Sequence, residues 1–320
     1  MPRVVISLVT WNSENDLPAC LAAIALQTYS DATLVVVDNA STDGTADVFG
    51  KLQTTNYKLQ TILNSVNLGY TGAHNQAIRW AVAHGAEFVL VLNPDVVPRP
   101  DVVAVMVAAM ERHPKAGSIG IPLLRDDSTI DSLGLDVGWG GRFIERGAGV
   151  RIQEAPQLPA SPAGGRSGTI ADEQVLGISG ACALYRLAAL DEVAYHAEKE
   201  KQYFDERFFA YKEDVDLALR LRARGWEAWM TYSSKAFHSR AVADASRGIV
   251  ALQYRGRGER SKQRSYLSYR NHLFVLKKHW RNIPTSHGQI VVYELGKAAY
   301  ALVREPWLLK AWYQCWKLEI

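Results

Sequence analysis

Residues 87–98 of this chain read EFVLVLNPDVVP, and they decide its fold. Their first half, Phe88–Leu92, is an unbroken apolar run, as is typical of a strand covered on both faces in a parallel sheet. Pro94 then ends regular pairing, and Asn93 and Asp95 carry oxygen-bearing side chains two residues apart. Ligands bind at the carboxyl ends of strands in open α/β sheets, so we expect a ligand there. A turn in which both side chains cap backbone amides would explain the same pattern.

Apolar runs alternate with helical patterns on both sides of this stretch. Further strands are predicted at residues 4–10, 34–37, 59–63, 118–121, 177–186 and 228–232, and helices at residues 17–26, from 45, and at 73–83, 101–113 and 214–224. This alternation predicts an α/β fold with a doubly wound, mostly parallel sheet flanked by helices, and with polar loops at the carboxyl ends of the strands.

The other segments have a different character. Residues 125–175 are rich in glycine and proline, which predicts an irregular excursion, either a mobile loop over the site or a disordered insert. Residues 266–281 and 289–316 are predicted to be helices rich in tryptophan, tyrosine and lysine. The predicted organisation is a catalytic domain at 1–245, with a nucleotide-binding half at 1–123 and an acceptor half at 124–245, and a helical extension at 246–320.

Composition narrows the class of protein. A chain of 320 residues with 48% hydrophobic content can bury a full core. Cys20, Cys182 and Cys315 are far apart, which argues against a disulfide framework or a thiolate metal site and favours a reducing compartment. The N-terminus shows no signal-peptide pattern and no apolar run has the length of a membrane span, so we expect a cytoplasmic location.

Charge is distributed unevenly along the chain. The formal net charge is +3, but residues 247–281 contain ten Lys or Arg and one acid, Glu259, a local charge of +9 that leaves −6 for the remainder. Basic segments of this kind bind anionic lipid surfaces, nucleic acid or phosphorylated substrates, or are only solvated.

Two further loops are candidates for nucleotide binding. Asp38 stands at the end of its strand, as Asp95 does. A carboxylate at that position can accept a hydrogen bond from a nucleobase N–H. Residues 39–43, which follow, fit an Asx turn and a helix cap instead. Residues 67–72, NLGYTG, place two glycines before a helix N-terminus, where backbone N–H groups suit a diphosphate. Glycines in a tight turn explain that loop equally well.

Carboxylates and one histidine complete the candidates. Glu213, Asp214 and Asp216 lie at the start of a helix, where one carboxylate can cap the helix while another faces the crevice as a general base. For Asp216 we favour an ion pair with Arg220 one turn later. His238 is either a packed residue or, with a carboxylate, a ligand for Mn²⁺ or Mg²⁺.

Taken together and in this order, these motifs resemble inverting glycosyltransferases of family 2 with the GT-A fold, and most closely their rhamnosyltransferase-like branch. The resemblance covers roughly residues 3–240 and rests on VVISLVTWNSENDLPACLAAIALQT, VVVDNASTDGT, NLGYTGAHNQAI, LVLNPDVVPRP, GISGACALYR and FDERFFAYKEDVDLALRLRARGW followed by FHS. It departs from many relatives at Asn93, where they have aspartate.

The resemblance implies roles for individual residues. It assigns the nucleotide to Thr10, Asn12 and Asp38, its diphosphate side to Asn67, Gly69 and Asn75, a divalent metal to Asp95 and His238 with Asn93 nearby, the catalytic base to Asp214, acceptor placement to Glu213, and a donor or acceptor pocket to Gly180, Ala181 and Cys182.

The resemblance also implies a reaction. It indicates transfer of a single sugar, best L-rhamnose from dTDP-rhamnose, to a hydroxyl of a glycan or lipid-linked acceptor in cell-surface polysaccharide synthesis, with no nucleic acid partner. UDP-galactofuranose, UDP-glucose or a UDP-acetamido sugar are alternative donors. A nucleotidyltransferase and a non-catalytic sugar- or lipid-binding module are the alternatives of another class.

The C-terminal segment suggests where the chain works. Trp280, Trp307, Trp312 and Trp316 lie among tyrosines and basic residues, a pattern typical of a helix at the inner membrane surface. A helical cap packed on the sheet, or a contact between subunits, would explain the same pattern.

Overall fold

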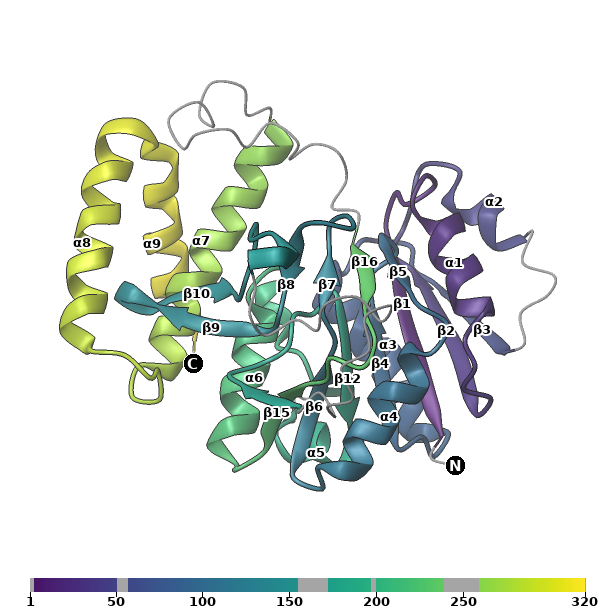
Figure 1. Cartoon of the computed structure of the whole chain (residues 1–320). Coiled ribbons are helices and arrows are strands. Elements are labelled where there is room, and N and C mark those ends of the chain that lie inside the picture. Colours follow the sequence, from purple (N-terminus) through teal and green to yellow (C-terminus); the bar gives the residue numbers. More distant parts are fainter. Residues whose placement is uncertain (1–2, 51–56, 155–171, 197–199, 239–258, 320) are drawn as a thin grey trace.

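The structure, a computed structural model, describes residues 3–50, 57–154, 172–196, 200–238 and 259–319. Its centre is an eight-stranded sheet (Figure 1). In spatial order the strands are β11 (Glu173–Val175), β15 (Glu227–Met230), β6 (Ala116–Gly120), β12 (Cys182–Arg186), β4 (Phe88–Leu92), β1 (Val4–Thr10), β2 (Ala32–Asp38) and β3 (Lys58–Leu63). The apolar run predicted as a buried strand is β4, near the middle of the sheet, and every residue in it is buried.

Most neighbouring strands of this sheet run parallel, as predicted. β4, β1, β2 and β3 form a parallel block, and β15 runs parallel to β6. The exceptions are β11, which pairs antiparallel with β15, and β12, which pairs antiparallel with both β4 and β6. Because β12 runs the other way, its first residue, Cys182, lies opposite Leu92, the last residue of β4. The residues before β12 therefore reach the edge where β4 ends.

Helices cover both faces of the sheet, which confirms the doubly wound prediction. They are α1 (Leu17–Ala25), α2 (Thr45–Gly50), α3 (Gly69–Ala83), α4 (Val102–Arg112), α5 (Leu187–Glu192) and α6 (Glu213–Ala223). Apolar residues of α1 and α4 pack in one core on one face, and those of α3 and α6 pack in a second core on the other. The predicted helix at 73–83 begins four residues earlier, at Gly69.

A second, four-stranded sheet positions part of the site. Its order is β5 (Val96–Pro98), β16 (Ala236–His238), β7 (Leu123–Leu124) and β8 (Ile130–Ser132). In its register His238 is the partner of Val96, the residue after Asp95. This pairing brings Asp95 and His238, which are 143 residues apart in sequence, next to each other.

The prediction of an irregular excursion from residue 125 is wrong for the part up to residue 154. That part contains β8, a hairpin of β9 (Leu135–Gly138) and β10 (Arg142–Glu145), and the short helices η1 (Trp139–Gly141) and η2 (Ile152–Glu154). Each strand is too short for the alternation of apolar and polar residues to be read from sequence. Residues 155–171 lie outside the described residues. Three further short elements lie between α5 and α6: β13 (Tyr195–His196), β14 (Lys201–Gln202) and η3 (Glu206–Phe208).

The C-terminal helices lie side by side against the β9–β10 hairpin and α6 (Figure 1). They are α7 (Glu259–His279), α8 (His287–Arg304) and α9 (Leu309–Lys317), with η5 (Pro306–Leu308) before α9. The single helix predicted at 289–316 is therefore broken, because Pro306 lacks the N–H that a continuous helix needs. The boundary after residue 245 stays a prediction. No helix in the described ranges has the length and apolar character to span a bilayer.

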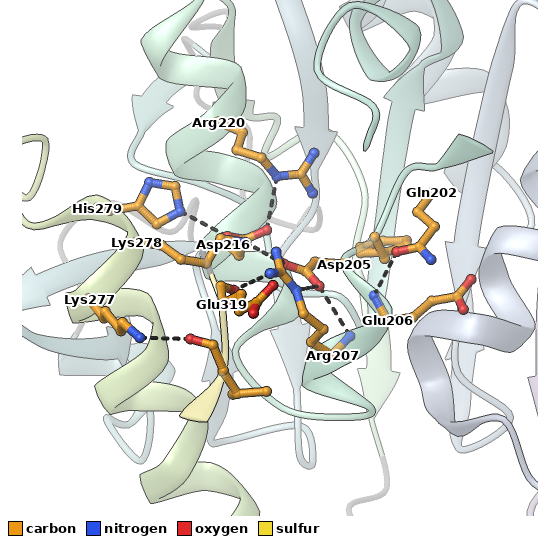
Figure 2. A network of polar contacts seen from close by, with 12 residues as sticks. Gln202, Asp205, Glu206, Arg207, Asp216, Arg220, Lys277, Lys278, His279 and Glu319 are labelled. Carbon is orange, nitrogen blue, oxygen red and sulfur yellow. Dashed lines mark hydrogen bonds and ion pairs between the residues drawn. The ribbon is translucent and has the colours of Figure 1, made fainter. Parts of the chain in front are cut away.

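Buried charges join α6 to α7 (Figure 2). Asp216 is fully buried and contacts Arg220 at 2.9 Å, Lys278 at 2.6 Å and His279 at 2.8 Å. Burial alone would raise the pKa of Asp216, but the charges of Arg220 and Lys278 and the hydrogen bond from His279 keep that pKa well below its usual range. The predicted Asp216–Arg220 pair is confirmed, as part of a larger network.

Candidate active site

A cleft of about 560 Å³ lies at the carboxyl end of β4. Five polar residues singled out in the sequence line it: Asn93, Asp95, Glu213, Asp214 and His238. They come from the loop after β4, from the first turn of α6 and from the end of β16. The fold therefore collects three distant segments of the chain at one hollow.

Asp95 and His238 form a pair on one wall of this cleft. His238 Nε2 lies 3.3 Å from Asp95 Oδ1, and its Nδ1 lies 2.8 Å from Oδ2 of the fully buried Asp131. Burial would lower the pKa of His238, but its hydrogen bonds to Asp131 and Asp95 raise it to about 9. No motif in the sequence pointed to Asp131, which comes from β8, beyond the reach of a local pattern.

The pair fits one half of a divalent metal site. Neighbouring ligands of an octahedral Mg²⁺ or Mn²⁺ ion are about 3 Å apart, close to the observed separation of Asp95 and His238. Asp131 holds the far nitrogen of the imidazole, as the outer carboxylate of a metal-bound histidine commonly does. In the part of the chain that the structure describes, no group of three or more His, Cys, Asp or Glu side chains could hold a metal ion. The protein would thus supply two ligands and leave the others to a diphosphate.

The side chain of Asp214 is held in place by backbone amides. Its Oδ1 accepts a hydrogen bond from Val215 N at 2.8 Å and its Oδ2 accepts one from Gly180 N at 3.2 Å. The carboxylate also lies at the N-terminus of α6, where the helix dipole favours negative charge. Half-buried and directed at the cleft, Asp214 is placed to accept a proton from a hydroxyl.

Glu213, its neighbour, has a different environment. The side chain is only 6% exposed, and Oε2 is buried with no hydrogen-bond partner among the described residues. Burial, and then the negative charge of Asp214, raise the pKa of Glu213 to about 8. At neutral pH Glu213 is therefore predominantly a neutral carboxylic acid, which can donate a hydrogen bond where Asp214 can only accept.

The loop before α6 is strained and is held by α7. Phe209, Tyr211 and Lys212 all have positive φ, between 65° and 73°, a region that non-glycine residues rarely occupy. Buried Asn271 of α7 donates hydrogen bonds to three carbonyl oxygens of this loop, including Tyr211 O at 2.7 Å. Arg270 donates to one of the same carbonyls, Phe208 O, and to Arg207 O before it. Sequence reasoning missed both residues, because nothing local marks an asparagine in a helix as an anchor for a distant loop.

The GAC segment is only partly at the cleft. Gly180 and Ala181 line it, and Gly180 O also accepts a hydrogen bond from the Tyr70 hydroxyl at 2.7 Å. Cys182 is buried in β12 and does not line the cleft. A side chain at position 180 would collide with Tyr70, whose hydroxyl would lie 2.7 Å from its Cβ. Glycine is thus needed where the Asp214 carboxylate meets the backbone.

The residues predicted to bind the nucleotide lie farther along the same sheet edge, outside the lining of the cleft. Thr10 and Asp38 are register partners at the ends of β1 and β2, and Thr10 Oγ1 donates to Asp38 Oδ1 at 3.0 Å. Thr10 is fully buried, so it orients Asp38 and does not reach a ligand. Asn12 accepts a hydrogen bond from Thr42 N, and Asn67 accepts one from the side chain of Asn39.

Two predicted diphosphate residues do not fit that role. Asn75 is fully buried, and its amide bonds the backbone of Tyr203 and Phe204 and the carboxylate of Glu206. Gly69 has φ +74°, and a Cβ there would lie 2.5 Å from Phe209. The start of α3 is therefore covered by the loop before α6, and both residues support that loop instead of a diphosphate.

Comparison with known proteins gives a family. The model of "Glycosyl transferase family 2" matches residues 5–194. An N-acetylglucosaminyl-diphospho-decaprenol L-rhamnosyltransferase of Mycobacterium tuberculosis is 31% identical over 246 residues, which cover 73% of this chain and 75% of that protein. An O-antigen biosynthesis protein of Myxococcus xanthus is 28% identical over 177 residues, 55% of this chain and 13% of that much longer protein.

Solved structures show the fold. The mannosyltransferase PcManGT of Pyrobaculum calidifontis, solved in complex with GDP-Man and Mn²⁺, has a TM-score of 0.54 at 17% identity. It covers 99% of this chain, which spans 87% of PcManGT. S. aureus TarS has a TM-score of 0.55 at 14% identity; 89% of this chain is covered, and the chain spans 41% of TarS. These likenesses agree with the predicted GT-A fold.

Proposed function

Because this chain belongs to glycosyl transferase family 2, and is therefore a glycosyltransferase, we propose that it moves a single sugar from a nucleoside diphosphate to an acceptor hydroxyl with inversion of configuration. The observation that carries this proposal is the cleft itself, in which the Asp214 carboxylate shares one hollow with Asp95 and His238. Family membership leaves the nucleotidyltransferase and the non-catalytic module without support.

The proposed reaction is one displacement. Asp214 accepts the proton of the acceptor hydroxyl, and that oxygen forms a bond to the anomeric carbon of the donor sugar while the bond from this carbon to the diphosphate breaks. Attack comes from the face opposite the leaving diphosphate, so the configuration inverts. Neutral Glu213 would donate a hydrogen bond that places the acceptor.

Asp95 and His238 would hold a divalent cation, with the Asn93 amide nearby and Asp131 fixing the imidazole. When bound, such an ion supplies positive charge that stabilises the leaving diphosphate. Mn²⁺ is present in the structure of PcManGT, which supports the class of ion. Beyond the cleft, we assign the nucleotide to Asp38, Asn12 and Asn67, which line the same edge of the sheet.

For the substrates we propose L-rhamnose from dTDP-rhamnose and a lipid-linked acceptor used in cell-surface polysaccharide synthesis. The relative from Mycobacterium tuberculosis supports both, since its name states an L-rhamnosyl transfer to N-acetylglucosaminyl-diphospho-decaprenol. UDP-galactofuranose, UDP-glucose and UDP-acetamido sugars are the competing donors. A thermal-shift screen of these nucleotide sugars with and without Mn²⁺ would identify the donor, because a ligand that binds the native state raises the melting temperature.

We further propose that the chain works in the cytoplasm at the inner face of the membrane. Apolar side chains of α8 and α9 are exposed to solvent, among them Leu295, Val303 and Trp316. Trp316 is 75% exposed, and Arg304 and Lys317 lie nearby in sequence. Tryptophan beside basic residues favours the boundary between lipid and water.

Asp214→Asn tests the proposed mechanism. The amide keeps the size of the side chain but accepts no proton, so we expect transfer to fall by at least about a hundredfold. Binding of the nucleotide sugar, measured by calorimetry, should stay within about threefold of wild type, because Asp214 lies on the acceptor side. Transfer near the wild-type rate would refute the base assignment.

A further inference from the structure

A second cavity of about 280 Å³ adjoins the candidate active site. It lies between β10, the loop before α6, and helices α7 and α8. Its lining is polar, with three cations and several hydroxyl groups: Arg142, Lys212, Lys297, Ser265, Ser268 and Tyr269. None of the roles assigned above uses this cavity.

Its positive charge is not neutralised by the contacts that hold the cations. Lys212 Nζ donates to the carbonyl oxygen of Phe143 at 3.0 Å. Arg142 lies 5.9 Å from the centre of the Tyr293 ring, and Lys297 lies 5.2 Å from that of Tyr269. Each of these three contacts is with a neutral group, a carbonyl oxygen or a tyrosine ring.

The acidic residues and the histidine at the pocket do not cancel its net positive charge. Glu305 is the one carboxylate in the lining, which leaves an excess of two positive charges. Glu294 lies behind the wall and is occupied by His272 Nε2 at 2.9 Å and by the Tyr269 hydroxyl at 3.0 Å. A small pocket with such an excess, lined by ammonium and guanidinium donors and by the Ser268 hydroxyl, has the chemistry of a phosphate site.

The pocket is continuous with the acceptor side of the active site. Lys212 and Ser268 line both cavities, and Lys212 stands two residues before Asp214. Asp95 and His238, which would hold the metal beside the donor diphosphate, line only the larger cleft. An anion bound here would thus be separate from the donor diphosphate and adjacent to the hydroxyl that faces Asp214.

We propose that this pocket binds a phosphate or diphosphate group of the acceptor, attached to the sugar whose hydroxyl is glycosylated. The inference rests on the proposed function and narrows its acceptor to a phosphorylated sugar. Arg142 and Lys297 supply most of the recognition, because Lys212 is partly engaged by Phe143 O. The group can belong to a lipid-linked sugar or to a soluble sugar phosphate, and the two have the same chemistry at this site.

Direct binding tests the site without any catalysis. Calorimetry would measure the affinity of the full chain for inorganic pyrophosphate in EDTA, which removes divalent ions from the donor side. We expect the double variant Arg142→Gln/Lys297→Gln to bind at least tenfold more weakly than wild type. The control Lys310→Gln removes an exposed cation on α9 and should leave the affinity unchanged. Equal affinity of the double variant and wild type would overturn the proposal.

Kinetics then identify the source of the phosphate and separate this inference from the proposed function. Transfer is measured to one sugar as a neutral alkyl glycoside, as a soluble sugar diphosphate and as a diphospholipid. In the double variant, KM should rise at least tenfold more for both phosphorylated acceptors than for the neutral glycoside. An equal rise for all three would overturn the proposal. A lower KM for the diphospholipid than for the soluble diphosphate would identify the lipid as the source. Absence of transfer to any acceptor would contradict the proposed function but leave the pyrophosphate result standing.

Discussion

Glu213 and Asp214 are adjacent carboxyl groups with opposite surroundings. Asp214 receives two backbone N–H groups, whereas Glu213 Oε2 is buried without a hydrogen-bond partner among the described residues. Pairs whose environments separate their protonation states commonly divide the acid and base roles of a site. The sequence showed that one of the two could face the crevice, but in the folded chain both line it.

Glu213→Gln should change how stability depends on pH. The raised pKa, about 8 in the folded chain against 4.5 when exposed, means that the unfolded chain loses this proton first as pH rises. The free energy of unfolding of wild type should therefore fall between about pH 4.5 and 8, by up to about 1.4 kcal/mol per pH unit from this group, and level off above. The glutamine variant lacks this contribution, so its stability relative to wild type should increase from pH 5 to pH 8.

Urea denaturation of both proteins at pH 5, 6.5 and 8 measures this difference. The matched control is Glu192→Gln, a substitution at an exposed glutamate on α5, which should show no such trend. A stability difference between Glu213→Gln and wild type that stays constant with pH would mean that Glu213 is ionised in the folded protein.

Among the elements, α7 supports the loop and the helix that carry the proposed base. Its Asn271 holds the carbonyl groups of the strained loop before α6, and its Lys278 bridges Asp205 at 2.5 Å and Asp216 at 2.6 Å. The loop and the first turn of α6 carry Lys212, Glu213 and Asp214 into the cleft. The predicted C-terminal extension is thus part of what positions the proposed base.

Asp216→Asn should destabilise the protein strongly. The substitution leaves Lys278, Arg220 and His279 buried without their shared carboxylate (Figure 2). Removing one partner from a buried ion network costs about 3–5 kcal/mol. Asp191→Asn is the matched control, because Asp191 makes an exposed ion pair with Lys201, and should cost less than about 1 kcal/mol. Chemical denaturation of both variants measures the contrast, and equal losses would show that the network contributes little.

Across the whole molecule, apolar surface is concentrated on the C-terminal helices. A groove of about 470 Å³ between α7, α8 and α9 is lined mainly by leucine, isoleucine and tryptophan. The basic segment next to it is only partly available to a membrane, because Lys278 is buried in ion pairs and Arg270 and Lys277 bind backbone carbonyls. Residues 239–258, which hold other cations of that segment, lie outside the described residues. Apolar insertion should therefore outweigh charge in membrane binding.

Liposome flotation tests this at two salt concentrations. We expect the chain to float with vesicles that contain anionic lipid, and to lose less than half of its binding between about 0.1 and 0.5 M salt, since apolar contacts are not screened. Trp316→Ser and Val303→Ser should reduce flotation, whereas Lys310→Gln should have a small effect. Absence of binding at low salt, together with a dimer in light scattering, would assign this face to a second copy of the chain.

Much of the fold could be predicted from local patterns. The apolar runs located β1 and β4 to the residue, because strands buried on both faces are apolar along most of their length. The short strands β7 to β10 were missed, since two to four residues carry no periodic signal. The predicted helix at 289–316 is broken at Pro306, where a proline lacks the N–H that a continuous helix needs.

By itself, the sequence determined the mostly parallel sheet, the family, and three side chains of the cleft, Asp95, Asp214 and His238. Each of these depends on residue types within a short motif. Only the tertiary structure decided which side chains contact one another in and around the cleft. It placed Asp131 behind His238, Asn271 under the loop before α6, and three cations around a pocket beside Asp214. The first two of these contacts join residues 107 and at least 60 positions apart, and a motif cannot encode a partner that only chain folding brings near.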